Sequence, residues 1–210
     1  MHGRCERPSH QSALVGTALA LLLPACASAP SWPHAPGHES EAPALPRAGD
    51  RTLTVGAYGG IPVLQKSFFW DGNGETDEAG VKARHLWFLS DRIALGGGLT
   101  ASVWFPSGHD ILAGELEAVG HWYFFRGESL GVFVEGATGY VHSTDPIPPK
   151  GTEWNFTFSF GPGVDVPIAK NFDLIGTTIY HHISNALGRQ SPQNPSQNEV
   201  QILLGVAWRF

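Results

Sequence analysis

An imidazole, a hydroxyl and a carboxamide occur within four consecutive positions near the C-terminus, at His182, Ser184 and Asn185. In a β-strand alternate side chains point to the same face, so His182 and Ser184 would lie together with their Cα atoms about 6.5–7 Å apart. A histidine beside a serine places a general base next to a nucleophile, which is the basis of hydrolytic acyl transfer. The same pair also occurs at the polar end of an ordinary strand, so the rest of the chain must support the chemistry.

A catalytic imidazole needs a further group to orient it, and Asn185 offers an amide that could hold an oxyanion. Glu199 is the only acid in the loop and strand that follow the pair. If the last two strands form a hairpin with Ser184 near Gln197, Glu199 falls opposite His182. The sequence therefore predicts Ser184 as nucleophile, His182 as base and Glu199 as the orienting acid.

The faces of these last strands leave that pairing open. Val200, Ile202 and Leu204 alternate along the final strand as an apolar outer face, which gives Glu199 the parity of an interior residue. Either the three catalytic residues face inward, or a bulge turns Glu199 outward.

Other polar residues give weaker signals. His181 alternates away from His182, and the remaining histidines of the body show no spacing typical of metal ligands. The acids of the body are expected to be interior polar packing: Glu115, Glu117, Glu135 and Asp165. The sequence thus predicts neither a metal nor another cofactor.

Residues 51–210 show repeated alternation of large apolar residues with glycines and acids. In 155–168, for example, the apolar face is rich in phenylalanine and valine, as in a lipid-facing band, whereas the other face resembles a narrow polar interior. Strands are expected near 52–60, 82–90, 93–105, 114–125, 130–142, 155–168, 171–184 and 198–210.

Short and long links alternate between these strands. The short ones lie at 90–92, 126–129 and 169–171, and the long ones at 61–81, 106–113, 144–154 and 185–197. This pattern predicts an all-β fold, an eight-stranded antiparallel transmembrane β-barrel with periplasmic turns and external loops. His182 and Ser184 would then lie at the external end, near the outer leaflet. The alternative is a soluble barrel that binds a small ligand, like a lipocalin. The continuous apolar faces argue against it.

The N-terminus has the features of an export signal, with a basic start, an apolar run over 13–25 and small residues before a cleavage site after Ala27. Cys26 lies in a weak lipobox, which leaves lipidation as a second possibility. Residues 28–50 are rich in proline and predict a linker before the barrel of 51–210. The net charge of -6 and the lack of a basic cluster argue against nucleic acid as a partner.

Several short motifs between Gly131 and Phe210 are shared with a known family. They are the Phe133–Gly139 strand, Pro148–Thr152, Asn155-Phe156, Gly161-Pro162-Gly163, Tyr180–Ala186, Asn194-Pro195 and the terminal Phe210. On these residues the chain resembles the lipid A deacylase family of outer-membrane acyloxyacyl hydrolases, known as PagL. Two departures fall in one loop: Leu187 stands before Gly188 where the family continues with glycine, and Ser196 replaces a glycine.

The resemblance implies an eight-stranded barrel in the outer membrane of a Gram-negative bacterium that removes the 3-O-linked acyl chain of lipid A. It implies Ser184, His182 and Glu199 as a catalytic triad, Asn185 as the oxyanion donor, and lipopolysaccharide as the partner. A catalytically silent barrel with a structural or lipid-binding role is the alternative, which the altered loop favours and the intact His-x-Ser-Asn motif opposes.

Overall fold

The computed structural model describes residues 44–63, 72, 76–187 and 194–210. The predicted signal peptide of residues 1–27, Cys26 and linker residues 28–43 lie outside the described residues. Within the described part of the chain, no helix is long and apolar enough to cross a membrane. The strands are β1 Arg51–Pro62, β2 Glu78–Ser90, β3 Ile93–Trp104, β4 Ile111–Arg126, β5 Gly131–Ile147, β6 Thr152–Ala169, β7 Phe172–Ser184 and β8 Gln197–Arg209.

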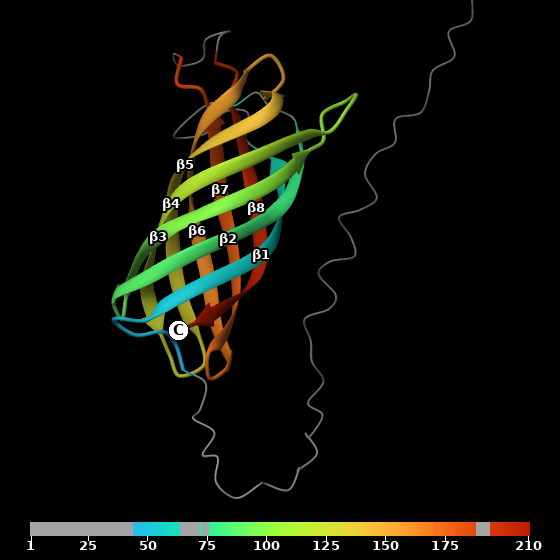
Figure 1. Ribbon diagram of the computed structural model, residues 1–210. Coiled ribbons are helices and arrows are strands. Elements are labelled where there is room, and N and C mark those ends of the chain that lie inside the picture. Colours follow the sequence, from blue (N-terminus) through green and yellow to red (C-terminus); the bar gives the residue numbers. More distant parts are fainter. Residues whose placement is uncertain (1–43, 64–71, 73–75, 188–193) are drawn as a thin grey trace, which may run out of the picture. The chain divides into compact units, whose positions relative to one another are not determined.

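These strands form one closed sheet (Figure 1). Each strand pairs antiparallel with the next along the chain, and β1 pairs with β8 to close the circle. Closure satisfies the backbone groups that a free edge would leave exposed. The predicted eight-stranded antiparallel barrel is thereby confirmed.

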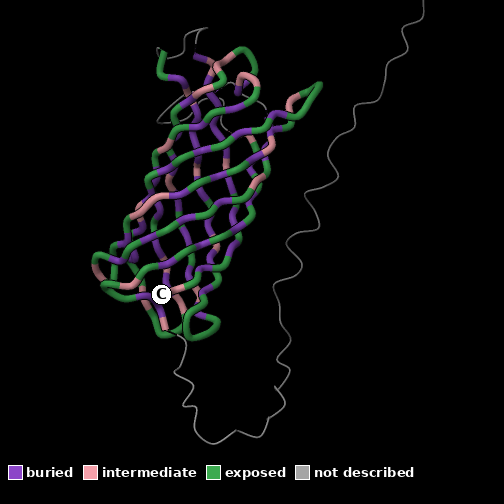
Figure 2. The backbone as a smooth tube through the Cα atoms, viewed as in Figure 1, coloured by how far each residue is buried: buried purple, intermediate pink, exposed green. Residues whose placement is uncertain are grey.

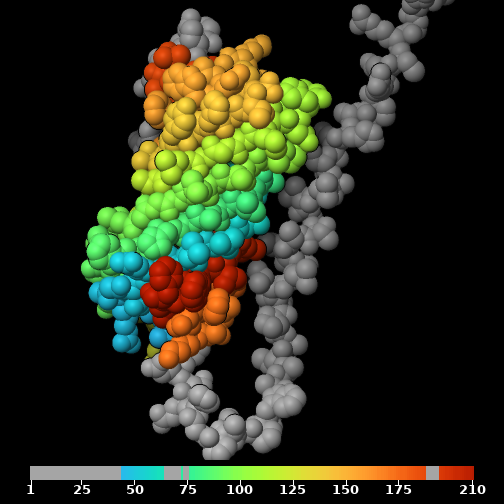
Figure 3. Space-filling model, viewed as in Figure 1, coloured from blue at the N-terminus to red at the C-terminus, as the bar shows by residue number. Residues whose placement is uncertain are grey.

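Burial alternates along most of each strand (Figure 2), and the large exposed side chains are apolar. β1 shows the pattern clearly: Val55 is 54% exposed, whereas Thr52 and Thr54 on the opposite face are buried. On the face drawn in Figure 3, strands β1 to β4 cover the wall in oblique bands. The exposed large side chains include Leu95, Leu99, Leu112, Leu116, Trp122, Phe124, Phe156, Ile202, Leu204 and Trp208. An apolar exterior around a polar interior is the arrangement that a lipid bilayer requires of a barrel.

Links at one end of the barrel are short, and the strands at the other end are longer than expected. Only Asp91-Arg92 and Lys170-Asn171 connect β2 to β3 and β6 to β7. The long link expected at 106–113 is shorter, because β4 already begins at Ile111. The link expected at 144–154 is shorter too, because β5 and β6 continue as a hairpin to Ile147 and Thr152 and turn through 148–151. This hairpin projects beyond the wall in Figure 1.

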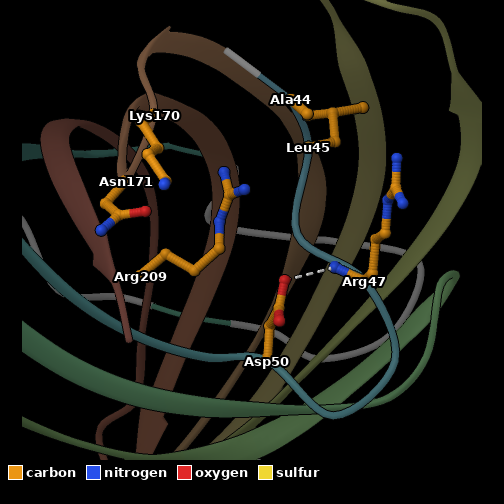
Figure 4. A pocket seen from close by; sticks show the side chains of 7 residues that line it. All are labelled: Ala44, Leu45, Arg47, Asp50, Lys170, Asn171 and Arg209. Carbon is orange, nitrogen blue, oxygen red and sulfur yellow. Dashed lines mark hydrogen bonds between the residues drawn. The ribbon is translucent and has the colours of Figure 1, made fainter. Parts of the chain in front are cut away.

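Residues 44–50, expected to be linker, fold against the end of the barrel that carries the short turns. Leu45 is buried, and the backbone oxygen of Pro46 accepts a hydrogen bond from Arg126 Nη2 at 2.5 Å. Figure 4 shows this segment beside Lys170 and Arg209, with the Arg47 amide bonded to Asp50. The ordered barrel unit therefore begins before residue 51.

Candidate functional site

Alternation along β7 sends neighbouring residues to opposite faces. Ile179, His181 and Ile183 are buried in the barrel interior, whereas Tyr180, His182 and Ser184 share the outer face with the exposed Thr178 of the same strand. The structure thus brings His182 and Ser184 together on one face, as expected, and that face is the outer wall.

Asn198 on β8 is the partner of His182. The two residues are directly opposite in the β7–β8 ladder, and His182 Nδ1 lies 2.7 Å from Asn198 Oδ1. The Tyr180 hydroxyl donates to the same oxygen at 2.7 Å. Because a carboxamide oxygen only accepts, this contact puts the imidazole proton on Nδ1 and leaves Nε2 as the base. We call Tyr180, His182, Ser184 and Asn198 the outer-face cluster.

Glu199 does not orient His182 in this structure, so that prediction was wrong. The hairpin pairs Ile183, not Ser184, with Gln197, and this difference of one residue puts Glu199 opposite His181. Its side chain is fully buried in the interior, with Oε1 2.5 Å from His181 Nδ1. The physical reason is that an unpaired carboxylate on the apolar outer wall would be costly, whereas the interior supplies polar partners.

Gly72, in the link between β1 and β2, lies against Asn198 of the outer-face cluster. A Cβ built on Gly72 would lie 2.9 Å from the carboxamide atoms of Asn198, so only glycine fits there. The Val63 amide also donates to the Asn198 backbone oxygen at 2.8 Å. Asn198 is therefore buried although it lies on the outer face, and His182 beside it is buried as well. Sequence reasoning missed both Asn198 and Gly72, and only the strand register would have identified Asn198.

Asn185 begins the turn that follows β7. Its backbone amide donates to Asn194 Oδ1, and its own Oδ1 accepts from the Leu187 amide, both at 3.0 Å. The side-chain donor of Asn185 is therefore Nδ2, which is the group an oxyanion would need. Ala186 adopts φ 59°, a left-handed conformation that is unusual for a residue with a side chain. Ser184 is half-buried at the end of the strand, and its hydroxyl has no hydrogen bond with another described residue.

The acids expected as interior packing are buried in the lumen. Arg84 donates to Glu117 Oε1 at 2.5 Å and to Glu135 Oε2 at 2.8 Å, and His121 lies 3.2 Å from the same Glu135 oxygen. Near the short turns the Tyr123 hydroxyl donates to a buried aspartate. A different lumen group, made of Glu78, His181 and Glu199, gathers ligand atoms within 4.8 Å of one another and could hold a metal ion.

No protein-family model matches the sequence, and no curated protein matches it either. Small outer-membrane barrels of known structure are similar in architecture. Neisserial surface protein A is 12% identical, covers 79% of this chain and 99% of its own, and superposes with a TM-score of 0.52. The outer membrane protein OprG from Pseudomonas aeruginosa is 12% identical, covers 78% of this chain and 97% of its own, and has a TM-score of 0.49. The outer membrane enzyme PagL is 19% identical, covers 74% of this chain and 97% of its own, and has a TM-score of 0.47. At such low identity the likeness to Neisserial surface protein A shows a shared fold alone.

Proposed function

We propose that this chain is a serine esterase of the bacterial outer membrane, which hydrolyses the 3-O-linked acyl chain of lipid A in lipopolysaccharide. The observation that carries the proposal is the 2.7 Å contact between His182 Nδ1 and Asn198 Oδ1 on the same outer face as Ser184. An ester at the lipid–protein boundary would approach the half-buried Ser184 from the outer side, without entering the barrel, while His182 and Asn198 stay buried behind it. The residues from Tyr180 to Ala186 resemble the motif of the deacylase family, and this resemblance supports the 3-O-linked acyl ester of lipid A as the bond that is cleaved.

The location is proposed from the surface of the barrel. Its large exposed side chains are apolar, and its strands of 12–18 residues exceed the roughly 9–11 residues needed to cross a bilayer. The expected export signal and the barrel closure agree with an outer membrane. The site then lies at the end opposite the short turns, where the outer leaflet of lipopolysaccharide would reach it.

Each residue has a defined part in the proposed reaction. His182 Nε2 takes the Ser184 proton while Oγ attacks the ester carbonyl, and Asn185 Nδ2 donates to the oxygen that becomes negative. Asn198 Oδ1 accepts from Nδ1 and stabilises the imidazolium. When the intermediate collapses, the sugar hydroxyl leaves with the proton from His182. Water then attacks the acyl-enzyme by the reverse proton path and releases the fatty acid.

A neutral Asn198 changes the electrostatics of this site. It fixes the tautomer and direction of His182 as a carboxylate would, but it adds no full negative charge beside the imidazolium. We therefore assign the role first expected of Glu199 to Asn198, and we expect slower hydrolysis than a carboxylate would give.

A catalytically silent barrel is the second candidate function. Three features favour it: the Ser184 hydroxyl has no hydrogen bond among the described residues, Asn198 is neutral, and the loop is altered at Leu187. In that case the outer-face cluster would serve lipid binding or barrel stability without bond cleavage.

Mass spectrometry of lipid A separates the two candidates. Cells that express the chain should lose one 3-hydroxyacyl group from lipid A, and cells that express Ser184→Ala to the same level in the outer membrane should not. Unchanged lipid A with confirmed insertion of the wild-type chain would contradict the esterase and favour the silent barrel.

A further inference from the structure

A second group of polar side chains lies inside the barrel, behind the outer-face cluster. It consists of Glu78 on β2, His181 on β7, and Glu199 and Gln201 on β8, and we call it the lumen cluster. All four side chains are nearly fully buried. One ligand atom from each of Glu78, His181 and Glu199 lies within 4.8 Å of the others.

Gly60 on β1 makes room for this arrangement. It pairs with Glu78 on one side and with Gln201 on the other, so the two side chains converge in front of it. A Cβ at Gly60 would lie 2.8 Å from Glu78 Cγ and 2.9 Å from Glu199 Oε2. The register of three strands therefore places two carboxyl groups side by side in a closed interior.

The carboxamide nitrogen of Gln201 lies at the centre of the lumen cluster. Nε2 lies 2.9 Å from His181 Nδ1 and 3.2 Å from Glu199 Oε1, and it also contacts Glu78 Oε1. Two amide hydrogens cannot serve three acceptors, while Gln201 Oε1 is buried without a hydrogen-bond partner. Rotation of the carboxamide by half a turn exchanges the two atoms and aims the oxygen at the same centre.

The charges around the lumen cluster do not balance. The nearby cations Lys82 and Arg84 form their ion pairs with Glu117 and Glu135 instead. Among the described residues, Glu199 has an ion pair with His181 alone. The other nitrogen of that imidazole, Nε2, is buried without a hydrogen-bond partner. Adjacent buried carboxylates need a positive charge or a proton between them.

We propose that the lumen cluster binds one divalent first-row metal ion. Glu78 and Glu199 each supply a carboxylate oxygen, His181 supplies Nδ1, and Gln201 supplies Oε1 after rotation. One nitrogen and three oxygens favour Zn²⁺ or Mn²⁺ over Ca²⁺ and Mg²⁺, which prefer oxygen ligands alone. The ion would join β2, β7 and β8 at the level of the outer-face cluster.

The surroundings hold the remaining carboxylate oxygens in place. The Tyr58 hydroxyl donates to Glu78 Oε2 at 2.9 Å. Gln197 Nε2 donates to the Thr76 backbone oxygen at 2.7 Å and lies 3.5 Å from Glu199 Oε2. Such outer contacts orient metal ligands and are characteristic of a built site.

The test uses the full chain, without an affinity tag, folded in detergent micelles and stripped with a chelator. Zn²⁺ or Mn²⁺ is added, free ion is removed, and bound metal is counted by elemental analysis beside thermal unfolding. We expect one equivalent per folded barrel and a higher Tm with either ion, and no such effect with Mg²⁺. A folded wild-type barrel that binds neither ion would overturn the proposal, because the two carboxyl groups then share a proton instead.

Near-isosteric variants locate the ion. Glu78→Gln and Glu199→Gln should each weaken metal binding about tenfold or more and abolish the rise in Tm. Asp165→Asn is the control, because this buried lumen carboxylate binds Tyr123 at 2.8 Å, away from the cluster. Folding is checked by the different gel mobility of boiled and unboiled samples. Equal binding by the wild type and both folded Gln variants would overturn the assignment, and if neither variant folds, the wild-type stoichiometry still decides.

Discussion

The two faces of the β7–β8 pair place neighbouring residues in opposite environments. His182 faces the apolar outer wall and contacts a neutral carboxamide, whereas His181 faces the lumen and contacts the carboxylate of Glu199. Each imidazole contacts its partner through Nδ1, and each partner is the residue directly opposite on β8. The strands thus carry two histidine pairs of similar geometry that differ in charge.

The difference follows from what each face can solvate. Apolar side chains cover most of the outer wall. A carboxylate among them would lose its hydration, and no cation would compensate its charge. The lumen holds Lys82 and Arg84 together with several acids, so charged groups find partners there. We infer that the apolar wall limits the outer-face cluster to neutral residues, and that a neutral Asn198 suits the third role in the proposed reaction.

Removal of the nucleophile should produce the largest effect and tests whether the outer face is the reactive one. Ser184→Ala should lower kcat/KM for an acyl ester about 10⁴-fold, because the covalent path is lost. Thr178→Ala is the matched control, since Thr178 is an exposed hydroxyl on the same face of β7. Rates are measured on folded protein in micelles, and equal activity of Ser184→Ala and wild type would exclude Ser184 as the nucleophile.

Asn185→Asp tests the oxyanion donor next. The substitution keeps the oxygen that accepts from the Leu187 amide, but it removes Nδ2 and introduces a negative charge at the oxyanion. We expect kcat to fall about 10²–10³-fold with a small change in KM. A loss confined to KM would show that Asn185 binds substrate without stabilising the transition state.

The comparison between the faces is sharpest in the neighbouring pair Asn198 and Glu199. Asn198→Leu should lower kcat about ten- to a hundredfold, the value of a hydrogen bond of ~1.5–3 kcal/mol to a charged group. Glu199→Gln should leave kcat almost unchanged, because its side chain lies on the other face. Asn198→Asp should increase kcat in protein that folds, because a carboxylate stabilises the imidazolium more strongly. Steady-state kinetics of the three variants would contradict the account if Glu199→Gln were the more damaging change.

Tyr180→Phe should give the smallest loss. The variant removes one hydrogen bond to Asn198 Oδ1 while the His182 contact stays in place. A neutral bond of ~1 kcal/mol corresponds to about fivefold in kcat. Tyr140→Phe, an exposed tyrosine of the outer wall, is the control, and identical losses in the two variants would argue against an orienting role.

The barrel could be predicted from sequence because its signal is repeated in every strand. Alternation over 155–168 and its counterparts fixes which side chains face outward, and strands with a lipid-facing side must close because a bilayer tolerates no free edge. Strand ends could not be predicted as well, because the β5–β6 hairpin beyond the wall has no bilayer to impose its pattern. The fold at 44–50 depends on contacts of Leu45 with distant residues, which no local pattern encodes.

The site could be predicted in part for a related reason. His182 and Ser184 share a face through local alternation alone, whereas the third group depends on how β8 pairs with β7. A shift of one residue exchanges Glu199 for Asn198, although the apolar pattern of β8 already gave Glu199 interior parity. The lumen cluster was invisible in sequence because Glu78, His181 and Glu199 come from three strands with no local spacing in common.

Covalent labelling with a fluorophosphonate probe measures whether the outer-face cluster activates Ser184. Folded wild-type protein in micelles is treated with the probe, and the modified peptide is identified by mass spectrometry. We expect Ser184 to be modified in the wild type and in Glu199→Gln, and to stay unmodified in His182→Ala. Folded wild-type protein without modification at Ser184, or labelling abolished by Glu199→Gln alone, would contradict the activation of Ser184 by this cluster.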